Sequence, residues 1–347
     1  SYAKKMGEED IFPSPTLYTF ISSKLHEDMN FNYKKNTLNQ NFIEYIEDNT
    51  SIKIDVLQAA KSGIKLLEAQ SVCPAWAFYE FRLGAKPIED EDEENLTTRL
   101  RGNLFHKSLE QFWMEYKSSS LVSALGEKEL SKKIQDIAHK TISTEQKKYP
   151  RILPELFNIE ENRLINYLEK WIQYELKRGD FEVKETEKSI PVHLGYLNFN
   201  IKIDRIDEVN QNKIVIDYKS GATKTLNEWF LNAYGELQMP FYALFASDKP
   251  IDAIAIGVIN TPKPQWIGIG RDMALLKGIK DPSSSSQYQS WDDLLGFWKC
   301  RINDAVKSYE MGDAAVRFMR EKDMAYCHVK PILRIPERTL QFEQTKQ

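Results

Sequence analysis

The sequence predicts an α/β or α+β domain in which a central sheet is flanked by helices. Two changes of pattern along the chain predict it. Apolar residues recur at helical spacing through most of residues 54–178, and then alternate with a period of two from 181 to 219. A helical stretch and two apolar strands follow, at 225–247, 252–259 and 265–270. Such an order of elements gives a sheet with helices packed around it.

The expected helices differ in how clearly they begin and end. Pro74 interrupts the first, three serines at 118–120 end the second, and an irregular tail follows the last. The acidic run 89–94, between the first two, is typical of a solvated loop. In chain order, the helices are expected at 54–83, 99–116, 126–147, 157–178, 225–247 and 288–311.

The expected strands begin as a hairpin. Two alternating segments meet at Gly195, a residue suited to a tight turn, and a third segment rich in β-branched residues follows. In chain order, the strands are expected at 181–194, 196–209, 213–219, 252–259 and 265–270.

Composition limits the kind of protein. The chain has 347 residues, 41% of them hydrophobic, enough for two domains or one large domain with extensions. No apolar run approaches the ~20 residues of a membrane span, so we expect no membrane contact. The net charge of −4 argues mildly against a nucleic-acid binder, although an enzyme needs only a local basic groove. Three cysteines, a small and odd number, do not suggest a disulfide framework. We therefore expect the reducing environment of the cytoplasm.

Residues 1–55 form a polar segment rich in Asn and Lys. Phe42, Ile43 and Ile46 could share one helix face, so we expect a helical N-terminal extension without chemistry of its own. The segment opens no signal-peptide pattern, and the chain begins at Ser1 rather than Met, so we expect a piece of a longer protein. The expected division is therefore an extension, 1–55, and one domain, 56–347.

Two aspartates and a lysine lie on neighbouring expected strands. Because strand side chains alternate between faces, Asp217 and Lys219 share a face, and Asp204 lies about a hairpin away. Carboxylate oxygens are the ligands that Mg²⁺ prefers, and such a metal polarises a phosphoryl oxygen and acidifies water. A nearby lysine can orient that water or neutralise developing charge. The three residues fit phosphodiester hydrolysis, although an Asp-x-Lys pair alone is typical of a surface ion pair.

Three further residues are candidates for the same site. His106 lies near the start of the helix 99–116, and Gln238 and Tyr242 are four residues apart, on one helix face. Each has an ordinary interpretation as well. A single helical histidine is typically a satisfied polar residue, and a Gln/Tyr pair is typically packing.

Taken in order, these segments resemble the RecB/AddB-type nuclease domains of the PD-(D/E)XK superfamily over about residues 64–335. The resemblance implies a restriction-endonuclease-like fold, with a mixed central sheet flanked by helices. The motifs that carry it are Leu66–Pro74, the Arg-Gly-x-x-x-His motif Arg101–His106, the block Ile203–Asp207, the block Ile216–Gly221, and the Gln-x-x-x-Tyr pair Gln238 and Tyr242.

The resemblance also implies roles for individual residues. A Mg²⁺ or Mn²⁺ ion would be held by His106, Asp204, Asp217 and the backbone carbonyl of Tyr218. Lys219 would be the catalytic lysine, acting beside Asp204 and Asp217. Other positions would orient the DNA or the active-site groups, with one weaker acidic candidate: Gln238, Tyr242 and Arg101, and the weaker Glu187.

Many nucleases of this type bind an iron–sulfur cluster through four cysteines. Here Cys73 and Cys327 fit the first two positions, but the next two fall on Lys330 and Pro336, which cannot ligate. We therefore expect no iron–sulfur cluster, although the two cysteines could still lie close together.

The activity implied is that of a Mg²⁺- or Mn²⁺-dependent deoxyribonuclease, an exonuclease of DNA repair or recombination. Its partners would be DNA and a helicase domain or subunit, of which residues 1–55 would be the tail. The alternative is a catalytically inactive DNA-binding or scaffolding module of the same fold, although a decayed site would be expected to have lost at least one core residue. A structural protein without a nucleic-acid role would leave the ordered motifs unexplained.

Overall fold

The computed structural model describes residues 49–59, 63–86, 95–220, 236–259, 263–285, 287–318, 321–325 and 327–335, and two short strands, β1 (Lys5–Met6) and β2 (Glu9–Asp10). The chain divides into two compact units, Ser1–Glu47 and Asp48–Gln347. In the first unit β1 and β2 pair antiparallel. The helix expected around Phe42, Ile43 and Ile46 lies outside the described residues.

The second unit contains the sheet. Its strands are β3 (Gln58–Ala59), β4 (Glu182–Leu194), β5 (Leu197–Val209), β6 (Asn212–Lys219), β7 (Ala253–Val258), β8 (Gln265–Gly270) and β9 (Ile279–Lys280). The strand order is β3-β5-β6-β7-β8-β9, with β4 paired to β5. The β3/β5, β6/β7 and β8/β9 pairs are parallel and the others antiparallel, so the sheet is mixed.

The helices follow the apolar periodicity. The longer ones are α2 (Gly63–Val72), α4 (Thr98–Glu115), α6 (Glu127–Gln146), α7 (Pro154–Glu175), α9 (Gln238–Phe245) and α10 (Trp291–Glu310). Shorter helices and single turns are α3 (Pro74–Ala77), η2 (Phe78–Arg82), α5 (Ser119–Ser123), η3 (Leu176–Arg178), η4 (Met273–Leu275), η5 (Pro282–Ser284), η6 (Glu321–Met324) and α11 (Lys330–Leu333). Several ends are set by local chemistry. The Thr97 hydroxyl, for example, caps α4 by accepting from Leu100 N.

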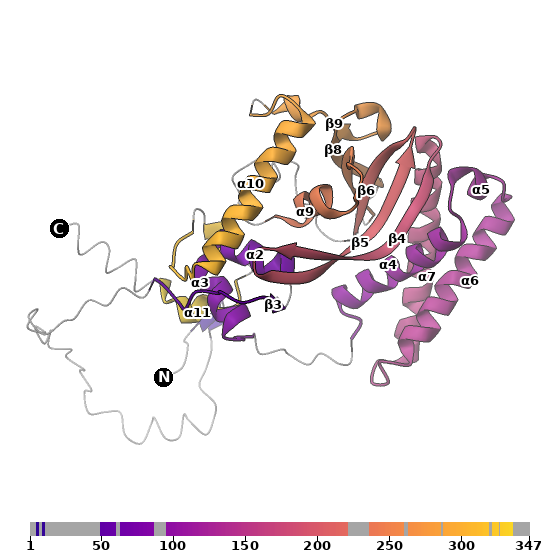
Figure 1. Ribbon diagram of the computed structural model, residues 1–347. Helices are drawn as coiled ribbons and strands as arrows, with labels where there is room; N and C mark the ends of the chain where they lie inside the picture. Colours follow the sequence, from indigo (N-terminus) through magenta and orange to yellow (C-terminus); the bar gives the residue numbers. More distant parts are fainter. Residues whose placement is uncertain are drawn as a thin grey trace, which may run out of the picture. The chain divides into compact units, whose positions relative to one another are not determined.

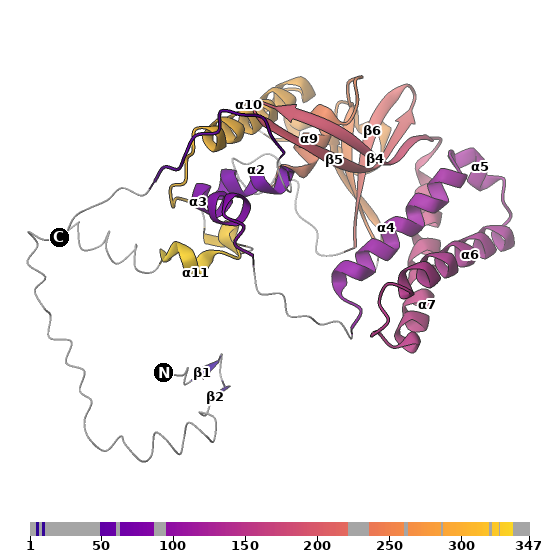
Figure 2. The same ribbon diagram turned by 60° about the horizontal axis from the view of Figure 1, so that its bottom comes forward.

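Helices cover both faces of the sheet (Figures 1 and 2). Ile214 and Ile216 of β6 pack in one buried cluster with residues of α4, α6 and α7. Val215, between them, packs in a second cluster with residues of α2, α9 and α10. The alternation along β6 therefore separates two apolar layers, as expected for a strand buried on both faces.

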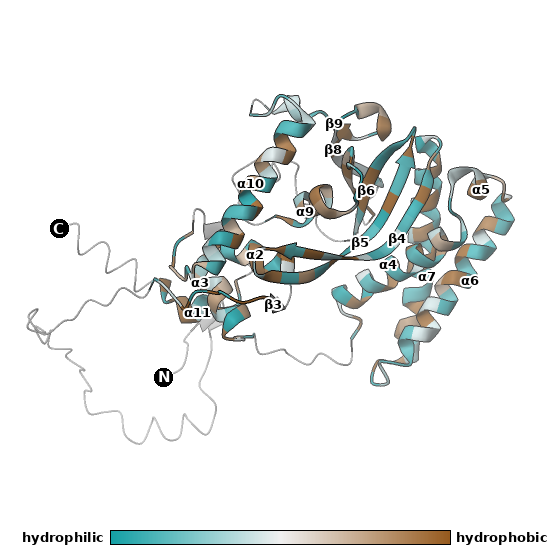
Figure 3. Cartoon of the chain, in the orientation of Figure 1, coloured by the Kyte–Doolittle hydropathy of each residue, from teal (hydrophilic) through white to brown (hydrophobic). Residues whose placement is uncertain are grey.

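The long helices are amphipathic, and Figure 3 shows hydrophilic and hydrophobic residues distributed along α6, α7 and α10. On α6, for example, Ile134, Ala138 and Ile142 share one side and are buried. A mixed sheet with helices on both faces confirms the predicted fold class. Among the residues that the structure describes, no helix has both the length and the apolar character needed to cross a membrane.

Three expected elements differ in the structure. The prediction of a helix starting at residue 54 is wrong for residues 54–59, because Gln58 and Ala59 form strand β3, which pairs with β5. Val56 and Leu57 are 63% and 68% exposed, so their helical spacing did not reflect burial. Ser118 begins a further short helix, α5, by accepting a hydrogen bond from Leu121 N. The described part of the expected helix 225–247 begins only at Gln238, and residues 221–235 lie outside the described part.

Candidate active site

The candidate site lies where β5 and β6 part. These strands pair from Val209↔Asn212 to Arg205↔Ile216, and the recorded pairing stops there. Asp204 and Asp217 occupy the next position on each strand, directly beyond the last pair. Instead of a strand-to-strand hydrogen bond, Tyr218 N donates to Oδ2 of Asp204 at 2.8 Å. The two aspartates predicted from the sequence thus lie together where β5 and β6 separate. This point, just beyond the pair Arg205↔Ile216, is called here the fork.

His106 reaches this fork from α4. Phe105 and Leu109, on the same helix, are buried against the sheet and fix the helix over it. Nδ1 of His106 lies 3.2 Å from Oδ2 of Asp204, and its ring meets the Tyr218 ring edge-on, 6.2 Å between centroids. The histidine therefore contacts the fork from the α4 side.

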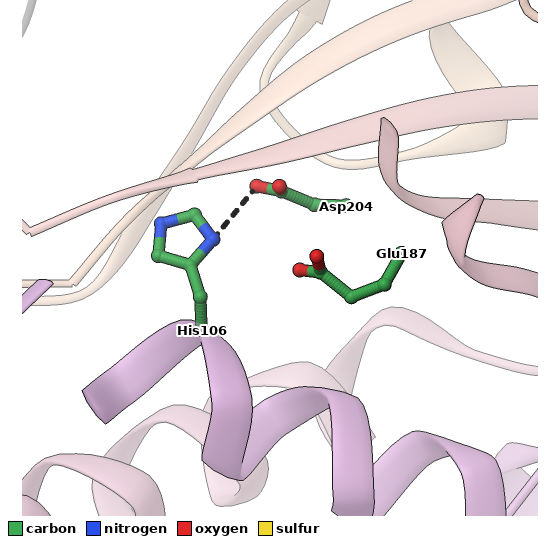
Figure 4. Close-up of side chains that lie close together, drawn as sticks. All are labelled: His106, Glu187 and Asp204. Carbon is green, nitrogen blue, oxygen red and sulfur yellow. Dashed lines mark ion pairs between the residues drawn. The ribbon is translucent and has the colours of Figure 1, made fainter. Parts of the chain in front are cut away.

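Glu187 enters from β4. The pairs Thr186↔Arg205 and Lys188↔Ile203 place it across from Asp204. Its φ of 46° lies in the left-handed region, a conformation that is uncommon for glutamate and costs of order 1–3 kcal/mol. Donor atoms of His106, Glu187 and Asp204 lie within 4.8 Å of one another, and Figure 4 shows the three side chains pointing toward a common point. Glu187 also forms an ion pair with Lys202.

A hydrogen-bonded chain joins Asp217 to α9. Gln238 Nε2 donates to Asp217 Oδ1 at 2.9 Å and lies 2.8 Å from the Tyr242 hydroxyl. Lys219 Nζ lies 2.8 Å from Asp217 Oδ2 and donates to Gln238 Oε1 at 3.1 Å. The Tyr242 hydroxyl donates to the Lys202 carbonyl at 2.7 Å. Gln238 and Tyr242, predicted as a pair on one helix face, therefore lie behind Asp217 and Lys219.

Burial and charge set the protonation of these groups. Burial, together with the charge of Asp204, raises the pKa of Asp217 to about 6, although Lys219 and His106 act in the opposite direction. For His106, burial works to lower the pKa, but the hydrogen bond and charge of Asp204, with the charges of Asp217 and Glu187, raise it overall. Burial also opposes the charge of Lys219, yet Asp217 and Asp204 raise its pKa. The negative charge of the carboxylates at the fork thus favours the protonated, cationic forms of His106 and Lys219.

The residues present fit a divalent cation. Carboxylate oxygens suit Mg²⁺ or Mn²⁺. Oδ2 of Asp217 is buried and, within the described protein, has the ion pair with Lys219 but no well-oriented hydrogen bond, so a lone pair remains for a cation. A small pocket adjoins the cluster and is lined by His106, Leu109, Glu110, Trp113, Thr186, Glu187, Asp204, Arg205 and Tyr218.

Not every expected residue lies at the fork. Nε of Arg101 lies 3.5 Å from Glu160 of α7, and the arginine side chain is 49% exposed. Conversely, sequence reasoning missed Glu110 and the carbonyl of Lys202. Burial, together with the charge of Glu187, raises the pKa of Glu110. The signal for Glu110 was its position four residues after His106, one helical turn along the same face.

The cysteines form part of a separate apolar cluster. Cys73 and Cys327 are buried together with Met324 and Val329, whereas Cys300 is exposed. Burial, with a contribution from the charge of Cys73, raises the pKa of Cys327 to about 11. The structure thus brings Cys73 and Cys327, the two cysteines that fit the first two iron–sulfur ligand positions, into one buried cluster.

Comparison with known proteins identifies the family of the chain. The family model of the PD-(D/E)XK nuclease superfamily matches residues 65–332. The chain therefore belongs to the PD-(D/E)XK nuclease superfamily.

It is 26% identical over 176 residues to an ATP-dependent helicase/deoxyribonuclease subunit of Lachnoclostridium phytofermentans, covering 46% of this chain and 14% of that protein. The chain thus spans about a seventh of that relative's length. A crystal structure of SSO0001 is 12% identical, with 81% of this chain and 88% of that chain covered, but its TM-score of 0.28 is too low to bear on the fold.

Proposed function

We propose that this chain is a Mg²⁺- or Mn²⁺-dependent deoxyribonuclease that hydrolyses phosphodiester bonds. The observation that carries the proposal is the convergence of His106, Asp204 and Glu187 donor atoms within 4.8 Å, beside the Asp217–Lys219 pair. These groups come from α4, β4, β5 and β6, so no single local motif would assemble them by chance. Membership of a nuclease superfamily supports the same function.

The metal would be held by His106, Asp204, Asp217 and the Tyr218 carbonyl, with Glu187 as a further donor. When bound, the ion would polarise a phosphoryl oxygen and acidify water. Asp204 is already oriented for this role, because Tyr218 N and His106 both contact its Oδ2. The strained backbone of Glu187 turns its carboxylate toward the same point.

Lys219 would orient the attacking water or neutralise charge on the phosphate. Its side chain is 40% exposed, so a solvent-borne substrate can reach it. Its Nζ is also held between Asp217 Oδ2 and Gln238 Oε1, which limits the positions it can take. A lysine so restrained loses less freedom when it meets a phosphate.

Gln238 and Tyr242 would position active-site groups rather than DNA. Tyr242 is only 3% exposed, and its hydroxyl is engaged by Gln238 and the Lys202 carbonyl. Gln238 contacts both Asp217 and Lys219. Arg101, by contrast, is half exposed on α4, earlier along the helix than His106, where a DNA backbone could reach it.

The setting would be DNA repair or recombination in the cytoplasm, with a helicase domain or subunit as partner. This rests on the similarity to a helicase/deoxyribonuclease subunit. The nuclease domain would comprise residues 56–347, and residues 1–55 would be an extension. Exonuclease action is the form we favour.

The test is degradation of end-labelled single- and double-stranded DNA with Mn²⁺ or with EDTA. Wild type should degrade DNA only with metal, and Lys219→Ala should lower the rate by about 10²–10³-fold, as for loss of one group that stabilises transition-state charge. Lys184→Ala is the matched control, since Lys184 is also a strand lysine in ion pairs, with Glu182 and Glu208, and neither partner is a proposed metal ligand. It should degrade DNA like the wild type.

The outcomes separate the two candidate functions. Metal-dependent degradation that is lost in Lys219→Ala alone supports the enzyme. DNA binding without degradation under either metal would reject it in favour of a catalytically inactive DNA-binding or scaffolding module.

A further inference from the structure

A fully buried charged cluster lies directly behind the fork, on the face of the sheet opposite Asp217. Tyr218 follows Asp217 on β6, so its ring points away from the Asp217 side chain, and its hydroxyl meets Arg205 of β5 on that face. The members are joined by hydrogen bonds or ion pairs and are called here the Arg205 network: Arg205, Asp207, Glu175, Arg178 and Tyr218.

Arg205 is the centre of this network. Its Nη1 donates to Glu175 Oε2 and to the Tyr218 hydroxyl, both at 2.9 Å. Its Nε and Nη2 donate to the two carboxylate oxygens of Asp207 at 2.5 and 2.7 Å. The guanidinium also lies 4.0 Å from the centroid of the Trp113 ring. Arg205, Asp207 and Glu175 are all 0% exposed.

Burying these charged side chains costs folding free energy. A buried ion pair is rarely more stable than apolar side chains of similar volume, because both charges must leave water. Two guanidinium groups and two carboxylates balance one another here, yet apolar residues would serve stability as well. Charged groups can instead fix geometry, because the planar guanidinium group forms directional hydrogen bonds that set the angle and distance of each partner.

The network acts where backbone pairing has ended. The recorded β5/β6 pairing stops at Arg205↔Ile216, so strand hydrogen bonds do not fix Tyr218 against Asp204. The Tyr218 hydroxyl, held by Arg205, ties β6 to β5 just beyond that point. On its other side the Tyr218 ring packs on Gly257 of β7, where an added Cβ would lie 3.0 Å from Tyr218 and 2.7 Å from Trp171.

We propose that the Arg205 network is a positioning device that holds the Asp204 carboxylate and the Tyr218 backbone at the separation a divalent metal needs. The proposal rests on the metal-dependent function above. None of its members needs to touch the metal or DNA through its side chain. They are positioning residues that act through Asp204 and through the Tyr218 main chain.

The test uses the full chain with two conservative variants. Tyr218→Phe removes the hydroxyl but leaves the backbone carbonyl in place, and Glu175→Gln removes one carboxylate without touching the proposed ligands. Tyr309→Phe is the matched control, because Tyr309 is a buried tyrosine of α10 outside the network. The Kd for Mn²⁺ is measured by electron paramagnetic resonance of free Mn²⁺, well below each variant's unfolding temperature.

Both network variants should weaken Mn²⁺ binding about tenfold or more, as residues that orient metal ligands typically do. Their DNA cleavage should recover toward the wild-type rate at saturating Mn²⁺, and Tyr309→Phe should bind Mn²⁺ normally. An unchanged Kd with a lowered unfolding temperature would overturn the proposal, since the network would then serve stability alone. If Tyr218→Phe does not fold, Glu175→Gln decides. Failure of the wild type itself to bind Mn²⁺ would instead reject the metal-dependent function, and this proposal with it.

Discussion

Asp217→Asn is expected to stabilise the metal-free protein while abolishing its metal-dependent activity. The Asp217 carboxyl is buried, with a side chain 2% exposed, and burial together with Asp204 raises its pKa from an ordinary value of 3.8 to about 6. A site shaped to bind a cation carries an energetic cost when the cation is absent. Asparagine has nearly the same shape and can still accept the hydrogen bond from Gln238 Nε2.

The size of the effect follows from the pKa. A gap of about two pH units, at about 1.4 kcal/mol each, makes the ionised carboxylate cost ~3 kcal/mol of folding free energy. Because the pKa of Asp217 is higher in the folded state than in the unfolded one, the folded state binds the proton more tightly. The cost is therefore absent below about pH 4, grows as the pH rises to about 6, and is constant above that. This figure already includes the favourable ion pair with Lys219, so the expected gain in stability for Asp217→Asn is up to ~3 kcal/mol.

Urea unfolding in EDTA, at pH 5 and at pH 8, measures this difference. Asp217→Asn should be more stable than the wild type at pH 8, and the difference should shrink at pH 5. Asp136→Asn, on the exposed side of α6, is the control and should stay within about 0.5 kcal/mol of the wild type. A variant less stable than the wild type at pH 8 would refute the reasoning, since the buried charge would then be fully compensated.

Two further predictions concern the metal and the cysteines. The Mn²⁺ affinity of the wild type, measured by calorimetry, should rise between about pH 6 and pH 8, because His106 and Asp217 have raised pKa values and must lose protons before they can ligate. His106→Gln should bind Mn²⁺ at least tenfold more weakly and show a shallower rise, whereas an unaltered pH profile would argue against His106 as a ligand. Cys327→Ser should leave DNA cleavage within twofold of the wild type, and the purified wild type should lack the visible absorption of an iron–sulfur cluster. Brown, iron-containing wild-type protein would contradict that expectation.

Much of the fold could be predicted from local pattern. The β4–β5 hairpin was expected from the alternation on either side of Gly195, and Gly195 does adopt a positive φ of 54°. The alternation expected along a strand is seen in β6, where Ile214 and Ile216 pack in one cluster and Val215 in the other. β3 could not be predicted, because two residues pair with β5 only through tertiary contact.

The site was predictable in its residue types but not in its arrangement. The spacing of Asp217 and Lys219 implied a shared face, and Lys219 Nζ lies 2.8 Å from Asp217 Oδ2. The contact of Glu187 with this group depends on a positive φ that sequence does not signal for glutamate. Arg205 and Asp207 belong to the Ile203–Asp207 motif, but the burial of Arg205 against Glu175 depends on α7, thirty residues earlier.

Anomalous diffraction from a crystal soaked in Mn²⁺ tests the central claim most directly. We predict one strong peak bounded by His106, Asp204 and Asp217, within reach of the Glu187 carboxylate, and no such peak in Asp204→Asn. A wild-type crystal with no peak at the fork, or with its strongest peak elsewhere, would contradict a metal-dependent nuclease built on these residues.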